Sequence, residues 1–155
     1  MSNYGIVDKE FLYKYARTIC DVIGHGANNK AVDLIVETAI AETGGGRVED
    51  KTDGAGMGIT QFDKFPFEDL RDRSLRLRTK IMTGLGVDIT KVQWDDLRYN
   101  AFLSLLFTRL QYFPFSEEIP KTIEERAVYW KKYYNTEAGK GTPQHYLEMN
   151  KNYKG

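Results

Sequence analysis

A single glutamate at the end of an apolar segment is the residue of this sequence best placed to do chemistry. Glu42 precedes Thr43 and three glycines, and a second glycine-rich stretch follows at residues 54–61. A carboxyl group that is partly desolvated, and that lies at the negative end of a helix dipole, has a raised pKa. A raised pKa keeps a proton available near neutral pH, which a general acid requires.

The helical phase of residues 31–43 distinguishes Glu42 from its neighbour Glu37. At about 100° per residue, one face of this segment is apolar and Glu42 lies at its margin. Glu37 falls nearly opposite and is expected to be solvated. The residues that share the apolar face are Val32, Ile35, Val36, Ala39, Ile40 and Thr43.

The glycine-rich stretch offers a surface that a ligand can approach closely. Gly54, Gly56 and Gly58 carry no side chain, so a ligand or the Glu42 helix can come near the backbone. Gln61 both donates and accepts hydrogen bonds, and it can therefore orient a carboxylate or a sugar amide. A phosphate-binding loop is disfavoured because no Lys-Ser/Thr pair follows. Taken alone, the glycines are equally typical of a simple turn.

These residues require a scaffold of helices. Apolar spacing, capping residues and Gly or Pro stops predict one mainly α-helical domain over residues 1–155, at most α+β. A small irregular or hairpin lobe is expected after the Glu42 helix, at residues 44–66. The predicted helices cover residues 8–23, 28–43, 66–70, 74–82, 95–112 and 122–134, with a last one from residue 142.

Composition removes several classes of function. The formal net charge is zero, so nothing favours nucleic acid as a partner. No stretch has the apolar length of a membrane span, and the N-terminus lacks the features of a signal peptide. His25 and His145 are far apart and have no cysteine partners, so neither a metal site nor a cofactor is predicted. Cys20, the only cysteine, is expected to be a buried apolar residue.

The motifs together resemble those of a known family. Glu42-Thr43, followed by Ala-Gly-Met-Gly-Ile-Thr-Gln at residues 55–61, is similar to the Glu-Ser and Gly-Ala-x-Gly-Leu-Met-Gln motifs of lytic transglycosylases with the goose-type lysozyme-like fold. Tyr99-Asn100 resembles the start of that family's Asn-bearing helix, and residues 133–135 resemble its Ala-Tyr-Asn motif. The stretch from residue 130 to 142 is similar to transglycosylase-like proteins of bacteriophages and prophages. The chain departs from the pattern in having Thr136-Glu137 where the family has a glycine.

The resemblance implies a lysozyme-like fold and a reaction. Glu42 would protonate the glycosidic oxygen between N-acetylmuramic acid and N-acetylglucosamine, and would then accept the proton of the muramic acid 6-hydroxyl. That hydroxyl attacks its own anomeric carbon, so no second carboxylate is needed to activate water. The residues implied to bind the glycan strand are Gly58, Ile59, Gln61, Tyr99, Asn100, Tyr134 and Asn135.

Two other functions remain open at this point. A lysozyme-type muramidase needs a second carboxylate about 6.5–9.5 Å from the acid, and Asp50, Asp53 or Asp63 can supply it. A non-catalytic glycan-binding or virion structural protein can share the fold, although it has no need of Glu42. The expected partners are peptidoglycan glycan strands and other virion or tail proteins, and the isolated domain is expected to be a monomer. After synthesis in the cytoplasm, the expected location is the virion, or the periplasm and cell wall of the host.

Overall fold

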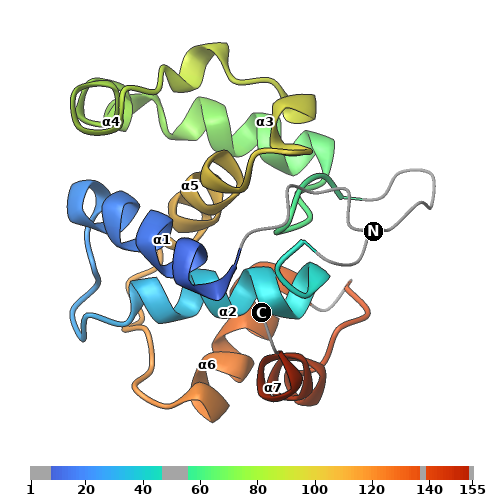
Figure 1. Ribbon diagram of the computed structural model, residues 1–155. Coiled ribbons are helices and arrows are strands. Elements are labelled where there is room, and N and C mark those ends of the chain that lie inside the picture. Colours follow the sequence, from blue (N-terminus) through green and yellow to red (C-terminus); the bar gives the residue numbers. More distant parts are fainter. Residues whose placement is uncertain (1–7, 47–55, 137–138, 154–155) are drawn as a thin grey trace.

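Seven α-helices make up most of the computed structural model, which describes residues 8–46, 56–136 and 139–153. This confirms the mainly α-helical fold, because the described residues contain essentially no strand (Figure 1). The α-helices are α1 Lys9–Ile23, α2 Ala31–Thr43, α3 Lys64–Arg73, α4 Arg78–Leu85, α5 Ala101–Tyr112, α6 Ile123–Trp130 and α7 Pro143–Asn152. The short helical turns are η1 Leu75–Leu77, η2 Ile89–Lys91, η3 Trp94–Leu97 and the π turn η4 Lys131–Asn135.

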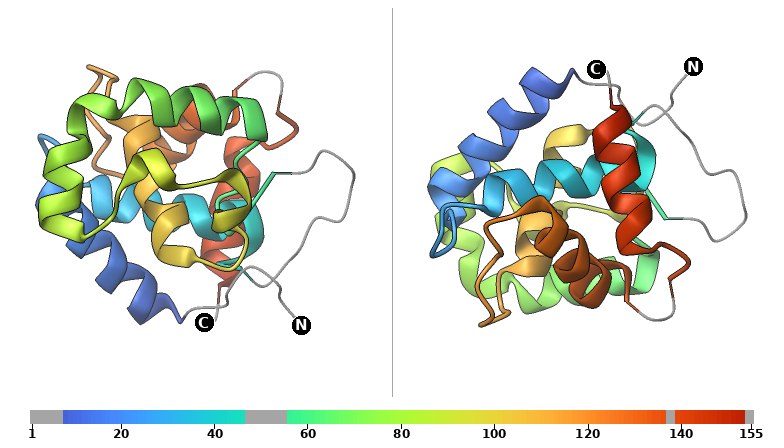
Figure 2. Two further views of the ribbon diagram at one scale, coloured as in Figure 1. Left: turned by 90° about the horizontal axis from the view of Figure 1, so that it is seen from above. Right: turned by 90° about the horizontal axis from the view of Figure 1, so that it is seen from below.

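The helix α5 lies at the centre of the domain. It packs against α1, α2 and α3, and every residue from 104 to 110 is buried. Figures 1 and 2 show α3 and α4 on one side of α5, with α6 and α7 on the other side against α2. A helix that is apolar on all sides belongs in a core, and α5 therefore supports both halves of the domain.

The helix α2 ends where the glycines predict. Gly44 adopts a left-handed conformation (φ 63°), and its N–H donates to Ile40 O at 2.8 Å. The N–H of Gly45 donates further back, to Ala39 O at 3.1 Å. Glycine accepts this conformation without a steric penalty, and it caps the carbonyl groups at a helix end. The last turn of α2 consequently stops directly after Glu42 and Thr43.

A small hairpin-like turn follows at residues 57–62. Met57 and Phe62 form an antiparallel bridge, with N–H···O distances of 2.7 and 3.1 Å. Gly58 (φ 79°) lies against η3 and α5, because a Cβ at this position would be 2.6 Å from Leu97 O and would also meet the Ser104 hydroxyl. The predicted lobe is thus present at residues 56–62, whereas Gly54, Asp50 and Asp53 lie outside the described residues.

Several predicted boundaries are wrong for local reasons. The long helix expected from residue 95 begins at Ala101, because Gln93 and Asp96 cap a separate turn, η3. The second helix begins at Ala31 rather than at residue 28 or 29, because Asn29 is left-handed (φ 57°). The third helix, α3, extends beyond both ends of the predicted range 66–70. The helix predicted over residues 74–82 is divided into the short turn η1 and the helix α4, which continues to Leu85.

The caps of the last two helices were predicted correctly. The Thr122 hydroxyl accepts from Glu125 N–H at 3.2 Å at the start of α6. The Thr142 hydroxyl accepts from His145 N–H at 3.1 Å, and Pro143 is the first residue of α7. None of the helices in the described part of the chain combines the length and the apolar character that a membrane span needs.

Candidate active site

Glu42 lies half-buried in the last turn of α2, and the side chain of Trp130 from α6 contacts it. The indole Nε1–H donates to Glu42 Oε2 at 3.1 Å. Burial raises the pKa of Glu42 to about 7; the hydrogen bond from Trp130 lowers this pKa, while the charge of Asp63 raises it. A carboxyl group with this pKa is protonated in a large fraction of molecules at neutral pH, which is the state that a general acid needs.

The residue after Glu42 joins α2 to the turn at residues 57–62. The Thr43 hydroxyl donates to Ile59 O at 2.7 Å and accepts from Gly46 N–H at 2.9 Å. Both Thr43 and Ile59 are fully buried. This contact fixes the turn relative to the Glu42 backbone.

Tyr134, in the π turn after α6, lies close to both the turn and Glu42. Its hydroxyl donates to Thr60 O in a short hydrogen bond, and its ring lies 5.5 Å from the rings of Phe62 and Tyr112. Burial raises the pKa of Tyr134, and the charge of Glu42 raises it further. Tyr134 is therefore a neutral hydroxyl next to the candidate acid.

A cleft of about 320 Å³ opens beside this group. It brings together three of the residues that the sequence assigns to glycan binding, Gln61, Tyr134 and Asn135. Glu42 does not line the cleft, but it interacts electrostatically with two residues that do: the charge of Asp63 raises the pKa of Glu42, and the charge of Glu42 raises the pKa of Tyr134. The lining residues are Gln61, Phe62, Asp63, Pro66, Gln111, Tyr134, Asn135, Thr136 and Gly139.

Two of the cleft amides are held by neighbouring groups. Gln61 Nε2 donates to Gly58 O at 2.9 Å, so this side chain stabilises its own turn. Asn135 Oδ1 accepts from Lys131 Nζ at 2.7 Å, and the same ammonium group donates to Gly139 O at 3.0 Å. These contacts give the polar wall of the cleft a defined shape without a ligand.

The structure does not bring the other four predicted binding residues into the cleft. The side chain of Asn100 caps α5 by accepting from Leu103 N–H at 2.9 Å. Tyr99 is 63% exposed, and its hydroxyl accepts from Arg98 Nε at 3.2 Å. Gly58 and Ile59 are buried within the turn at residues 57–62 and do not line the cleft.

Asp63 and Trp130 both interact with Glu42, which the sequence did not predict for Trp130 and predicted for Asp63 only as one of three possible second carboxylates. Asp63 precedes α3 but its side chain makes no capping hydrogen bond, and it lines the cleft instead. Trp130 lies four residues before Tyr134. A buried indole N–H needs an acceptor, but no local pattern in the sequence shows that Trp130 is buried or that Glu42 is its acceptor.

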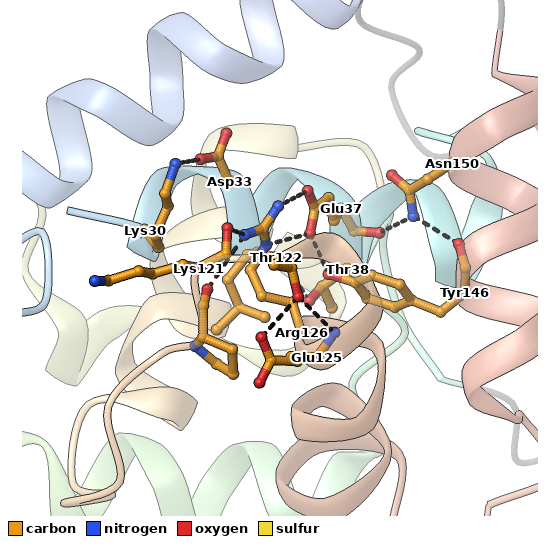
Figure 3. A network of polar contacts seen from close by, with 12 residues as sticks. Lys30, Asp33, Glu37, Thr38, Lys121, Thr122, Glu125, Arg126, Tyr146 and Asn150 are labelled. Carbon is orange, nitrogen blue, oxygen red and sulfur yellow. Dashed lines mark hydrogen bonds and ion pairs between the residues drawn. The ribbon is translucent and has the colours of Figure 1, made fainter. Parts of the chain in front are cut away.

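The expectation for Glu37 was wrong. This residue is 6% exposed, and its carboxylate accepts two hydrogen bonds from Arg126, each 2.8 Å long, and one from the Tyr146 hydroxyl at 2.7 Å (Figure 3). The face of α2 that seemed polar is covered by α6 and α7, which supply these partners. Helical phase could not show this, because α2 is packed on all sides.

No family model, curated protein or solved structure matches this chain. Among the residues that the structure describes, no group of three or more His, Cys, Asp or Glu side chains has the arrangement of a metal site.

Proposed function

We propose that this protein is a lytic transglycosylase that cleaves the glycan strands of peptidoglycan, with Glu42 as general acid and base. The observation that carries the proposal is the environment of Glu42. A carboxyl group with a pKa of about 7 lies beside a cleft lined by amides and aromatic rings. Amides bind the hydroxyl and acetamido groups of sugars, and the largely buried rings of Phe62 and Tyr134 form part of the apolar wall of the cleft. The sequence motifs around Glu42 and Gln61 support the same class.

The proposed reaction needs only one acid. Glu42 gives its proton to the oxygen of the bond between N-acetylmuramic acid and N-acetylglucosamine, and that bond breaks. The carboxylate then takes the proton of the muramic acid 6-hydroxyl, whose oxygen bonds to the anomeric carbon of the same sugar. The products are a 1,6-anhydromuramic acid end and a free 4-hydroxyl on N-acetylglucosamine. An attacking group within the same molecule has a large effective molarity.

Hydrolysis by a muramidase is the second candidate, and the position of Asp63 favours it. The Asp63 carboxylate lines the cleft, makes no capping hydrogen bond and raises the pKa of Glu42 by its charge. Burial raises the pKa of Asp63 itself. A second carboxylate on the cleft side of the acid can hold and activate a water molecule.

Product analysis on purified peptidoglycan sacculi separates these candidates. We expect the wild type to release anhydromuramic ends, Glu42→Gln to lose about 10²–10⁴-fold in rate, and Asp63→Asn to remain active. Reducing muramic acid ends, together with loss of activity in Asp63→Asn, would identify a hydrolase. A folded Glu42→Gln variant with wild-type activity would rule out Glu42 as the general acid in both mechanisms, whereas a folded wild type that releases neither kind of end would leave a glycan-binding protein.

We further propose that the enzyme is phage-encoded and acts on the cell wall from the virion or during host lysis. The similarity of residues 130–142 to transglycosylase-like phage proteins supports this proposal. Mass spectrometry of purified virions tests it, because a virion enzyme co-purifies with the tail proteins whereas a lysis enzyme stays in the lysate.

A further inference from the structure

Next to Glu42 lies a small buried cluster that the proposed reaction does not use. Ala41, Ala127, Trp130 and Tyr146 form it, and they come from α2, α6 and α7. Within this cluster the rings of Tyr146 and Trp130 are in contact, with their centroids 5.3 Å apart. The indole that donates to Glu42 is thus also in contact with α7.

A buried ion pair lies next to this cluster, and we call Glu37, Arg126 and Tyr146 together the Glu37 network (Figure 3). The side chains of the ion pair are 7% and 8% exposed. Arg126 Nε and Nη2 each donate to one carboxylate oxygen of Glu37 at 2.8 Å, in a two-pronged arrangement. Arg126 Nη1 donates to the carbonyls of Pro120 and Lys121, at 3.2 and 2.9 Å. Almost all of the hydrogen-bonding capacity of this guanidinium is used.

The network and the Glu42 contact lie along the same pair of helices. Glu37 and Glu42 are five residues apart on α2, which is about 7.5 Å along a helix axis. Arg126 and Trp130 are four residues apart on α6, so they share one face of that helix. The two helices are therefore joined at two points, Glu37–Arg126 and Glu42–Trp130.

Tyr146 links these two points directly. Its hydroxyl donates to Glu37 Oε1 at 2.7 Å, while its ring contacts the indole of Trp130. Asn150, one turn further along α7, donates to the backbone carbonyl of Glu37 at 3.2 Å. The middle of α2 is consequently bound to α7 as well as to α6.

We propose that Glu37, Arg126 and Tyr146 are positioning residues for the active site: they set the register of α6 and α7 against α2, so that Trp130 meets Glu42. A two-pronged Arg–carboxylate pair fixes both distance and orientation, which apolar contacts do not. A buried ion pair is weak evidence for stability as such, because desolvation offsets much of the attraction. Its defined geometry is what distinguishes it here from a packed apolar pair.

The fluorescence emission of Trp130 provides a test of this proposal that does not require enzyme activity. The emission of an indole that donates to a carboxyl group changes when that group titrates. We therefore expect an emission change centred near pH 7, the pKa of Glu42. Both Glu42→Gln and Trp130→Phe should abolish it, and this comparison separates the contribution of Glu42 from those of Asp63, Tyr134 and His145. His145 lies near because its Nε2–H donates to Ala41 O at 2.9 Å.

In Glu37→Gln, the amide keeps the size of the carboxylate but places a donor where Arg126 requires an acceptor. We expect the emission change to be lost, or its midpoint to move by about one pH unit. Any such shift should be upward, because the Trp130 hydrogen bond lowers the pKa of Glu42. Tyr146→Phe, which removes only one hydroxyl, should also move the midpoint upward, but by less than Glu37→Gln. Ile81→Ala is the matched control. Ile81 is fully buried in α4, which does not pack closely against α2, so the cavity that this substitution creates should leave the midpoint unchanged.

An unchanged emission curve in Glu37→Gln and Tyr146→Phe would overturn the proposal. An equal shift in Ile81→Ala would also overturn it, because general loosening of the fold would then explain the effect. Absence of the emission change in the wild type would do the same, since the Trp130–Glu42 contact would not exist. If Glu37→Gln does not fold, Tyr146→Phe alone decides.

The catalytic meaning of the network rests on the proposed function. On sacculi, we expect kcat of Tyr146→Phe and Glu37→Gln to fall, by about 10- to 100-fold for Glu37→Gln, with KM near the wild-type value. A wild type that shows the emission change but no cleavage would refute the proposed function and leave the positioning role intact. A KM effect without a kcat effect would refute the positioning role in catalysis.

Discussion

Glu42 is a carboxyl group between an indole donor and a cleft. On one side the Trp130 N–H favours the carboxylate, and on the other burial and Asp63 favour the protonated acid. The balance gives a pKa near 7, so that both protonation states of Glu42 are accessible at neutral pH. A group that first donates and then accepts a proton requires this property.

The pH dependence of activity should therefore have an alkaline limb at about pH 7. The general acid must be protonated, so kcat/KM falls as the pH rises through the pKa of Glu42. Because the hydrogen bond from Trp130 lowers this pKa, Trp130→Phe should move the limb upward by roughly one unit. Turbidity assays on sacculi across pH 5–9 measure the shift, and a downward movement would contradict the assignment.

Glu42 should also cost stability at alkaline pH. Its pKa is raised in the folded protein, so folding favours the protonated form, and this advantage is lost as the pH rises from about 4.5, the pKa of an unperturbed glutamate, to about 7. Glu42→Gln, which stays neutral, should thus stabilise the protein on the order of 2 kcal/mol at pH 8 and much less at pH 5. Urea unfolding at the two pH values tests this, and an equal effect at both would contradict it.

At the scale of the elements, the turn at residues 57–62 is held by hydrogen bonds to three neighbouring elements. Thr43 binds it from α2, Tyr134 from the π turn, and Thr60 donates from its own side chain to Ser104 O at 3.3 Å. Gly58 makes the close approach to η3 and α5 possible. The wall of the cleft is built on this turn.

Two glycines with the same backbone conformation allow the close approach to be measured. Gly58 and Gly86 both have positive φ, 79° and 70°, but a Cβ at Gly86 would meet nothing within 4 Å. Gly86→Ala should cost only the conformational strain, about 1 kcal/mol. Gly58→Ala should cost roughly 2 kcal/mol more, because the methyl group meets the Leu97 carbonyl and the Ser104 hydroxyl. Urea unfolding compares them, and equal losses would show that the turn can move away.

Local signals predicted those elements whose ends are set by local chemistry. The glycine end of α2 and the caps at Thr122 and Thr142 depend on a few neighbouring residues, and each was found as predicted. The burial of Glu37 was missed because its partner Arg126 is distant in sequence. Glu42 was identified from helical phase and motif, whereas its contact with Trp130 depends on how α6 packs on α2, which no local pattern contains.

At the scale of the molecule, α5 separates two groups of helices. The group of α3 and α4 lies on one side, and the group of α6 and α7 joins α2 on the other (Figure 1). The cleft draws its lining from both groups, with Asp63 and Pro66 near the start of α3 and Asn135 after α6. The shape of the cleft consequently depends on how both groups of helices pack against α5.

Cys20 provides a probe of that core. It is fully buried in α1, as expected from the sequence, and burial raises the pKa of its thiol to about 11. A thiol reagent at pH 8 should label the native protein at least roughly a hundredfold more slowly than the urea-unfolded chain. The labelling rate should rise in step with unfolding measured by circular dichroism. Rapid labelling of the folded protein would reveal a local opening of α1.

The π turn after α6 has a consequence for how this sequence can vary in length. Between Trp130 and Asn135 the chain closes a wider turn, in which Thr136 N–H donates to Lys131 O at 2.7 Å. One residue rotates a helix by about 100°. Loss of a single residue from this turn would therefore swing Tyr134 and Asn135 away from Thr60 and the cleft, while α6 itself remained intact. Insertions and deletions should be far less tolerated here than in the connections on the outside of the domain.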